Sequence, residues 1–168
     1  VTDECYVINS FSKFFSMTGW RVGWMVVPQN HIRVVERLAQ NLFICSPHVS
    51  QITALEAMSC EDELSQNLNI YHKNRQIIMD GLQHIGLQSF APPDGAFYFY
   101  IDISKYSDDS LSFCNDILQE VGVAITPGVD FDPARGKTTI RISYARSTDE
   151  ITEGINKLGD FMKKRGYF

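Results

Sequence analysis

A single lysine among small hydroxyl residues is the first feature of the sequence that could do chemistry. Lys13 follows Ser10 and Ser12 in the segment Asn-Ser-Phe-Ser-Lys, and Arg21 stands eight positions later between two glycines. A lysine amine can form a Schiff base with an aldehyde cofactor. Two hydroxyls and a guanidinium, which binds bidentately, can hold a phosphate. These side chains are the parts needed to bind pyridoxal 5′-phosphate (PLP).

Arg21 lies in a mostly apolar run, residues 20–27, which predicts a strand. An unpaired charge in such a strand would be costly, so we expect the guanidinium to meet an anion. A phosphate near Lys13 is one candidate, and a carboxylate in a structural salt bridge is the alternative. The alternative for Lys13 is a solvated loop lysine, and for Ser10 and Ser12 it is a simple turn.

A second arginine, Arg141, also lies in a run of apolar and β-branched residues, 138–144, that predicts a strand. Its planar guanidinium matches a carboxylate through two parallel hydrogen bonds. The alternative is an arginine on an edge strand that faces water. Arg135 and Arg146 lie nearby in segments typical of loops, and they rank below Arg141 as carboxylate ligands.

Taken in order, these motifs resemble those of fold-type I PLP-dependent enzymes, and specifically the class I/II aminotransferases. The resemblance covers the whole chain, but only the carboxyl-terminal portion of such an enzyme. The start at Val1 instead of Met also indicates a cut inside a longer protein. The segments that carry the resemblance are Ser10–Lys13, Met17–Gly23, Gly95–Tyr98, Thr126–Gly128 and Ile140–Tyr144.

The resemblance implies a role for each candidate residue. Lys13 is the catalytic lysine, which carries the Schiff base and moves the α-proton of the substrate. Ser10, Ser12 and Arg21 bind the cofactor, with Ser10 a better phosphate ligand than Ser12. Arg141 binds the α-carboxylate of the substrate. The implied enzyme is a PLP-dependent aminotransferase that moves an amino group between an amino acid and a 2-keto acid, and it is a homodimer.

Two other functions remain open on these residues. The first is a PLP-dependent lyase, racemase or acyl-condensing enzyme of the same fold, because the cofactor supplies the difficult chemistry in all of them. The second is a catalytically incompetent truncated domain. The family takes its pyridinium aspartate, its stacking aromatic residue and its ligand of the cofactor's 3′-oxygen from the amino-terminal half. We therefore expect the 168-residue chain alone to lack efficient transamination.

Composition excludes several classes of protein. Hydrophobic residues make up 44% of the 168 residues, and the net charge is −5 without a long basic run, which argues against a nucleic-acid partner. No apolar run is long enough to span a membrane. The four cysteines and four histidines show no metal-ligand spacing, so no metal site is expected. Isolated cysteines in apolar segments are typical of buried thiols in a reducing compartment, which predicts a cytoplasmic protein.

Hydrophobic periodicity predicts an α/β fold in two pieces. Residues 1–74 are expected to be the remainder of a large PLP-binding domain, and residues 75–168 a small carboxyl-terminal α/β domain that carries Arg141. The resemblance implies this division, whereas the residues show only a change of composition after a long helix. The expected helices cover residues 31–43, 46–58, 62–87, 110–121 and 148–164, and the expected strands cover residues 5–8, 20–27, 96–102, 123–126 and 138–144.

Overall fold

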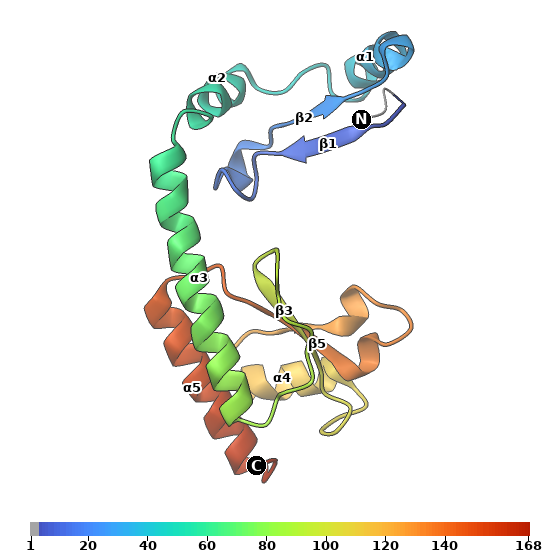
Figure 1. The fold of residues 1–168 in the computed structure, drawn as a ribbon. Coiled ribbons are helices and arrows are strands. Elements are labelled where there is room, and N and C mark those ends of the chain that lie inside the picture. The colour runs from blue at the N-terminus through green and yellow to red at the C-terminus, as the bar shows by residue number, and fades with distance from the viewer. Residues whose placement is uncertain (1–3) are drawn as a thin grey trace. The chain divides into compact units, whose positions relative to one another are not determined.

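The structure, a computed structural model, describes residues 4–168, which form two compact units. The first unit ends at Asn67, and the second is Leu68–Phe168. The longest helix, α3 (Glu61–His84), begins in the first unit and continues into the second (Figure 1). Both units combine helices with strands, as expected for the α/β class. Within the described residues, no helix has the length and apolar character needed to cross a membrane.

In the first unit, β1 (Val7–Ser10) and β2 (Gly23–Val26) form an antiparallel pair. Every residue of both strands is exposed. The strand predicted over residues 5–8 is wrong in its extent, because the observed strand begins at Val7 and ends at Ser10. The side chains of a two-stranded ribbon stay exposed to solvent unless another element packs against them. The sequence pattern of a strand does not indicate which element that is.

The segment before β2 forms a turn. Thr18–Trp20 is a short 3-10 helix, η1, and Arg21 caps it in the left-handed conformation, with φ of 51°. The Arg21 guanidinium donates to the Thr18 carbonyl at 2.7 Å, which satisfies the end of this short helix locally. The strand predicted over residues 20–27 is therefore shorter than expected, and Arg21 lies outside it.

Two helices follow in the first unit. A 3-10 turn, η2 (Gln29–His31), leads into α1 (Ile32–Leu42), and α2 spans His48–Ala57. Both predicted helices are confirmed. No residue of α1 is buried, so its apolar stripe is open to solvent in this unit.

The buried core of the first unit is small. It consists of Phe11, Met17 and Ala54, and the ring of Phe15 packs against the ring of Phe11 at 4.6 Å between centroids. Phe11 and Met17 flank Lys13 in the chain. The core of this unit is therefore built largely from the loop that carries the candidate lysine.

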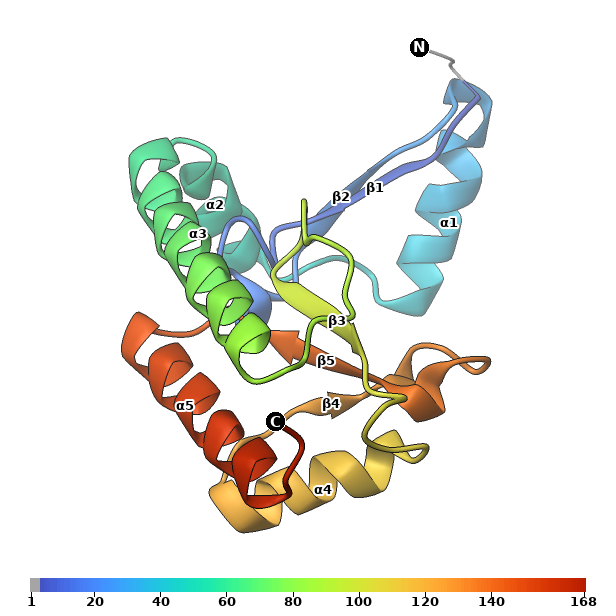
Figure 2. The same cartoon turned by 60° about the horizontal axis from the view of Figure 1, so that its bottom comes forward.

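The second unit contains an antiparallel sheet in the order β3 (Tyr98–Asp102), β5 (Thr139–Ser143), β4 (Thr126–Pro127). Figure 2 shows β5 between the other two strands. β3 and β5 confirm two predicted strands. The strand predicted over residues 123–126 is wrong in extent, because only Thr126 and Pro127 pair with β5. Proline has no N–H to donate and is confined to sheet edges, which limits this strand.

Two capped helices complete the second unit. The Asp109 carboxylate accepts from two backbone N–H groups at the start of α4 (Ser110–Val121). A capping box of Ser147 and Glu150 begins α5 (Thr148–Lys164). Both predicted helices are confirmed, with starting residues close to those expected, because their caps are local signals in the sequence.

The core of the second unit lies between one face of the sheet and helices α3, α4 and α5. Side chains alternate across a strand, so the residues between the buried positions of β3 and β5, Tyr98, Tyr100 and Arg141, face the other side of the sheet. The most deeply buried side chains are Ile78, Leu82, Phe99, Ile101, Ile117, Ile140, Leu158, Phe161 and Met162.

A buried asparagine on α3 fixes the chain after β5. Asn74 has no exposed surface, and its Nδ2 donates to the carbonyls of Tyr144 at 3.1 Å and Arg146 at 2.7 Å. These bonds satisfy two backbone acceptors that lie just beyond the strand. Asn74 therefore connects the long helix to the end of the strand that carries Arg141.

Replacing this asparagine tests that connection. We expect Asn74→Ala to lower the free energy of unfolding by about 2–4 kcal/mol, because two carbonyls lose their donor. Lys73→Ala, an exposed neighbour on the same helix, should change it by less than about 0.5 kcal/mol. Urea denaturation followed by circular dichroism measures both. Equal stabilities of the two variants would contradict the assigned role.

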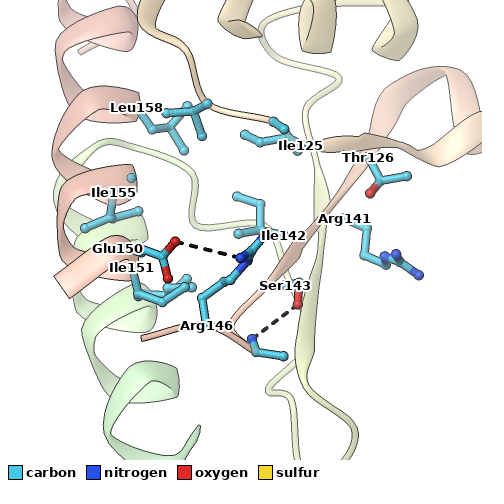
Figure 3. A pocket seen from close by; sticks show the side chains of 15 residues that line it. Ile125, Thr126, Arg141, Ile142, Ser143, Arg146, Glu150, Ile151, Ile155 and Leu158 are labelled. Atoms are coloured by element: carbon cyan, nitrogen blue, oxygen red, sulfur yellow. Dashed lines mark hydrogen bonds and ion pairs between the residues drawn. The ribbon is translucent and has the colours of Figure 1, made fainter. Parts of the chain in front are cut away.

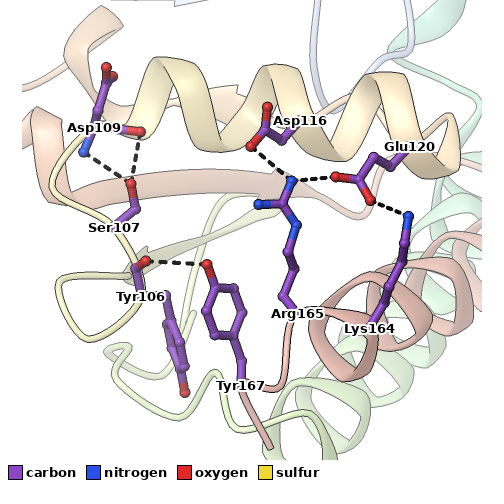
Figure 4. Close-up of polar contacts among 8 residues, drawn as sticks. All are labelled: Tyr106, Ser107, Asp109, Asp116, Glu120, Lys164, Arg165 and Tyr167. Atoms are coloured by element: carbon purple, nitrogen blue, oxygen red, sulfur yellow. Dashed lines mark hydrogen bonds and ion pairs between the residues drawn. The ribbon is translucent and has the colours of Figure 1, made fainter.

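Ion pairs join α4 to the end of α5 on the surface (Figure 4). Glu120 pairs with Lys164 at 2.7 Å and with Arg165, and Arg165 also pairs with Asp116 at 3.1 Å. The hydrogen bond from Lys164, followed by the one from Arg165, lowers the pKa of the Glu120 carboxyl below its ordinary value. The folded protein therefore favours the charged form of this carboxyl.

Acid should weaken this link. Because the pKa of Glu120 is lower in the folded chain, the pairing stabilises the fold at pH values above the ordinary glutamate pKa of about 4.3. The stabilisation is lost as the pH falls through the lowered pKa. We expect the melting temperature of wild type to exceed that of Glu120→Gln at neutral pH, and the gap to close on acidification. Calorimetry from acid to neutral pH measures the gap, and a gap that widened in acid would contradict the pairing.

Candidate active site

The loop between β1 and β2 presents Lys13. The Phe11 N–H donates to the Val22 carbonyl at 3.2 Å and extends the strand ladder, and the Met17 N–H donates to the Phe11 carbonyl at 3.1 Å. The Ser16 N–H donates to the carbonyl of Lys13 itself at 2.9 Å. The backbone of Lys13 is therefore fixed by a turn, while the residue is exposed.

Hydroxyl groups stand at the start of the same loop. The Ser10 Oγ accepts from the Ser12 N–H at 3.1 Å, which closes a short turn at the end of β1. The simple turn considered as the alternative to phosphate binding by Ser10 and Ser12 is therefore present. It leaves the hydroxyl proton of Ser10 available, because a hydroxyl both accepts and donates. Ser10 can form this turn and donate to an anion at the same time.

Arg21 belongs to the same end of the hairpin, two residues before Gly23, which pairs with Ser10. Among residues 4–168, its guanidinium makes no ion pair, and its hydrogen bond goes to the Thr18 carbonyl. The salt bridge considered as the alternative is thus not found in this part of the chain. An exposed cation without an acid, hydroxyl donors and an amine on one loop fit the phosphate and aldehyde groups of PLP.

A glycine allows the two strands to meet below this loop. A Cβ atom added to Gly23 would lie 2.5 Å from the backbone oxygen of Asn9, closer than real Cβ contacts allow. Gly19 has no atom within 4 Å of the corresponding position. Of the two glycines that flank Arg21, only Gly23 is required by close approach of the backbone.

Arg141 lies in the middle strand of the second unit's sheet, paired with Tyr100 of β3 and Thr126 of β4. The carbon at the centre of its guanidinium is 4.3 Å from the centroid of the Phe131 ring and 5.3 Å from that of Tyr98. Its Nε is buried and has no hydrogen-bond partner in the described part of the chain. A buried donor without a partner costs about 1–3 kcal/mol, so this position suits an anionic ligand.

The other two arginines near Arg141 in sequence are paired with acids. Arg135 Nε contacts Asp132 at 3.1 Å, and Arg146 lies 3.8 Å from Glu150. No ion pair to Arg141 occurs within residues 4–168. The predicted ranking of Arg141 above Arg135 and Arg146 as a carboxylate ligand therefore has a physical basis. Within residues 4–168, Arg141 is the one of the three whose N–H donors are not paired with an acid.

A cavity of about 240 Å³ lies on the other side of β5, between the sheet and α5. Figure 3 shows Ile125, Ile142 and Leu158 directed toward one another there, whereas the Arg141 side chain points away. The cavity is mostly apolar, and Arg141 is one of the residues that line it although its side chain points away in this view.

The structure places the candidate residues in two groups. Ser10, Ser12, Lys13 and Arg21 share one hairpin of the first unit, and Arg141 lies in the sheet of the second. Residue types and spacing missed the aromatic rings beside Arg141. The alternation of β3 could have indicated that Tyr98 shares a face with Arg141, but no pattern marks Phe131, which reaches the guanidinium from an irregular segment.

Comparison with known proteins identifies the family. Residues 1–158 match the sequence model of the family "Aminotransferase class I and II", and the chain belongs to this family. Valine–pyruvate aminotransferase of Mycobacterium tuberculosis is 47% identical over 93% of this chain. A (5-formylfuran-3-yl)methyl phosphate transaminase of Methanocaldococcus jannaschii is 36% identical over 96% of it. The chain spans 41% and 43% of the lengths of these two relatives.

Solved structures agree with this assignment. The crystal structure of an aminotransferase from Mycobacterium tuberculosis matches 97% of this chain, and 43% of its own, with a TM-score of 0.93 and 45% identity. The predicted family is thus confirmed, and so is PLP as the cofactor that its members use. The lyase, racemase and acyl-condensing alternatives are not favoured, because the relatives are named aminotransferases.

The close approach at Gly23 can be tested by adding one methyl group. We expect Gly23→Ala to separate β1 from β2 at this pair, so that the Phe11 amide exchanges its hydrogen at least about tenfold faster, equivalent to about 1.4 kcal/mol. Gly19→Ala should leave this exchange unchanged, because space is open there. Hydrogen exchange followed by NMR measures both. Equal exchange rates in the two variants would show that the hairpin tolerates a side chain at position 23.

Proposed function

We propose that this chain is the carboxyl-terminal portion of a PLP-dependent aminotransferase that moves an amino group between an amino acid and a 2-keto acid. One observation carries the proposal: neither Arg21 nor Arg141 has an acidic partner within residues 4–168. One cation stands on the lysine loop and the other in the sheet of the second unit. The reaction needs a cation for a phosphate and another for a carboxylate, and the aminotransferase names of the relatives support it.

The hairpin of the first unit would hold the cofactor. Arg21 would bind the phosphate through two N–H groups, and the Ser10 hydroxyl would donate to the same group. Ser12 would contribute its hydroxyl as a weaker ligand. When bound, PLP supplies the electron sink that makes the Cα–H bond of an amino acid breakable.

Lys13 and Arg141 would act on the substrate. Lys13 Nζ would be the attachment point for the cofactor's aldehyde carbon, and it would remove the proton from Cα of the amino acid. Arg141 would bind the α-carboxylate through two parallel hydrogen bonds, which limits the rotation of the substrate and holds that proton in one direction. Its unpartnered Nε supports this role.

We also propose the domain assignment and the setting of the whole protein. Residues 1–74 would be the remainder of the large domain and residues 75–168 the small domain, and the compact units support a division in this region of α3. The exposed apolar side chains of β1, β2 and α1 support burial of the first unit against further protein surface. The whole protein would be a cytoplasmic homodimer.

The cofactor site can be tested by titrating the 168-residue chain with PLP. We expect a visible absorption band that is lost in Lys13→Ala and kept in Lys73→Ala, because only the loop lysine reacts with the aldehyde. Arg21→Ala should weaken PLP binding about 10- to 100-fold, the effect of losing a charged hydrogen-bond partner. A wild-type chain without a lysine-dependent band would support the alternative of an incompetent truncated domain.

The reaction type is read from the products in the full-length protein. A transaminase that receives only an amino acid forms at most one equivalent of keto acid per site and releases no ammonia. Release of ammonia, sulfide or carbon dioxide over many turnovers would instead identify a lyase or decarboxylase. Efficient turnover by the 168-residue chain alone would contradict the expectation that the remainder of the enzyme is required.

A further inference from the structure

We propose that Phe131, together with Tyr98, is a positioning residue for Arg141. The two aromatic rings hold the guanidinium in position, which an acidic partner would otherwise do. Aromatic support of this kind keeps the N–H donors of the arginine available for a carboxylate. The inference rests on the proposed role of Arg141 in binding the substrate, and it assigns that arginine its supporting residues.

The contacts define the arrangement. The ring of Phe131 lies 4.3 Å from the guanidinium carbon, well inside the distance at which a cation is attracted by an aromatic face. The ring of Tyr98 lies 5.3 Å away. Tyr98 pairs with Ser143, so it is diagonal to Arg141 across the two strands, where long side chains still meet. Two rings from separate segments therefore contact one cation.

Aromatic and acidic partners have different consequences for binding. A carboxylate would occupy the same N–H groups that a substrate carboxylate needs, and the substrate would first have to displace it. An aromatic ring interacts with the face of the guanidinium and leaves the N–H groups in its plane unused. Arg135 and Arg146 show the other arrangement within this unit, since each is paired with an acid.

The segment that carries Phe131 is fixed by close packing. Gly128 and Gly136 meet backbone to backbone: a Cβ on Gly136 would lie 2.5 Å from the Gly128 oxygen, and a Cβ on Gly128 would overlap Thr139. The buried hydroxyl of Ser110 donates to the Gly136 carbonyl at 2.6 Å. The base of this segment therefore cannot shift without breaking contacts with β5 and α4.

The beginning and end of the segment are tied together as well. The amides of Phe131 and Asp132 both donate to the Gly128 carbonyl at 2.9 Å. The Asp132 carboxylate accepts from the amides of Ala134 and Arg135 at 2.9 and 3.0 Å. The exposed fraction of Phe131 is 49%, so its ring stands at the surface of this unit. From this position the ring contacts the Arg141 guanidinium.

The experiment compares ring removal with ring replacement. Phe131→Leu keeps an apolar side chain but removes the aromatic face, Phe131→Trp restores a face, and Phe168→Leu makes the same change at a ring of similar exposure. In the 168-residue chain without cofactor, binding of acetate is followed by NMR through the Arg141 Nε–H signal. In the full-length enzyme loaded with PLP, kcat and KM are measured for the amino acid and for the keto acid.

We expect Phe131→Leu to weaken acetate binding, and to raise both KM values, by about tenfold, while kcat changes by less than about twofold. Phe131→Trp should restore binding to within about threefold of wild type, and Phe168→Leu should match wild type. A general loss of structure would lower kcat and would not be rescued by tryptophan. That outcome would overturn the positioning role, as would wild-type binding by Phe131→Leu.

Arg141→Lys separates this inference from the proposed function. Loss of acetate binding in Arg141→Lys with no change in Phe131→Leu would retain the carboxylate site and reject the aromatic support. Unchanged acetate binding in Arg141→Lys would reject the carboxylate site itself, and the inference with it.

Discussion

An arginine in the middle strand of a sheet, with no acidic partner among residues 4–168, is the feature that the rest of the second unit holds in place. Arg141 is flanked by strands on both sides, so its side chain has one face of the sheet available. The opposite face is covered by the core under α3, α4 and α5. Three features fix the strand that carries Arg141: its pairing in the sheet, the packing of the capped helices, and the hydrogen bonds of the buried Asn74. The position of the guanidinium is therefore set by the position of this strand.

The first unit is organised in the opposite way. Its buried residues are few, and two of them belong to the loop that carries Lys13. Its strands and α1 expose their apolar side chains, so hydrogen bonds within the hairpin, more than burial, set the geometry of the lysine loop. Such a unit gains most of its stability from whatever surface covers it, because apolar burial is the dominant favourable term in folding.

The elements predicted well from the sequence are those with local signals. Caps at Asp109 and Ser147 mark α4 and α5, and a run of apolar and β-branched residues marks β5. The errors fall where a local pattern cannot decide. Arg21 stands between the apolar residues Trp20 and Val22 in the sequence, yet its backbone is left-handed and it caps a 3-10 helix, so it lies outside the predicted strand. The contact of Phe131 with Arg141 joins an irregular segment to a strand, and no local pattern in the sequence predicts that the two side chains meet.

The left-handed backbone at Arg21 has a consequence for how this position can vary. A side chain there costs roughly 1–2 kcal/mol that glycine would avoid. The substitution that most relieves the backbone strain at Arg21 is therefore also the one that removes its guanidinium. With the role proposed for Arg21, backbone strain favours glycine at this position and phosphate binding favours arginine.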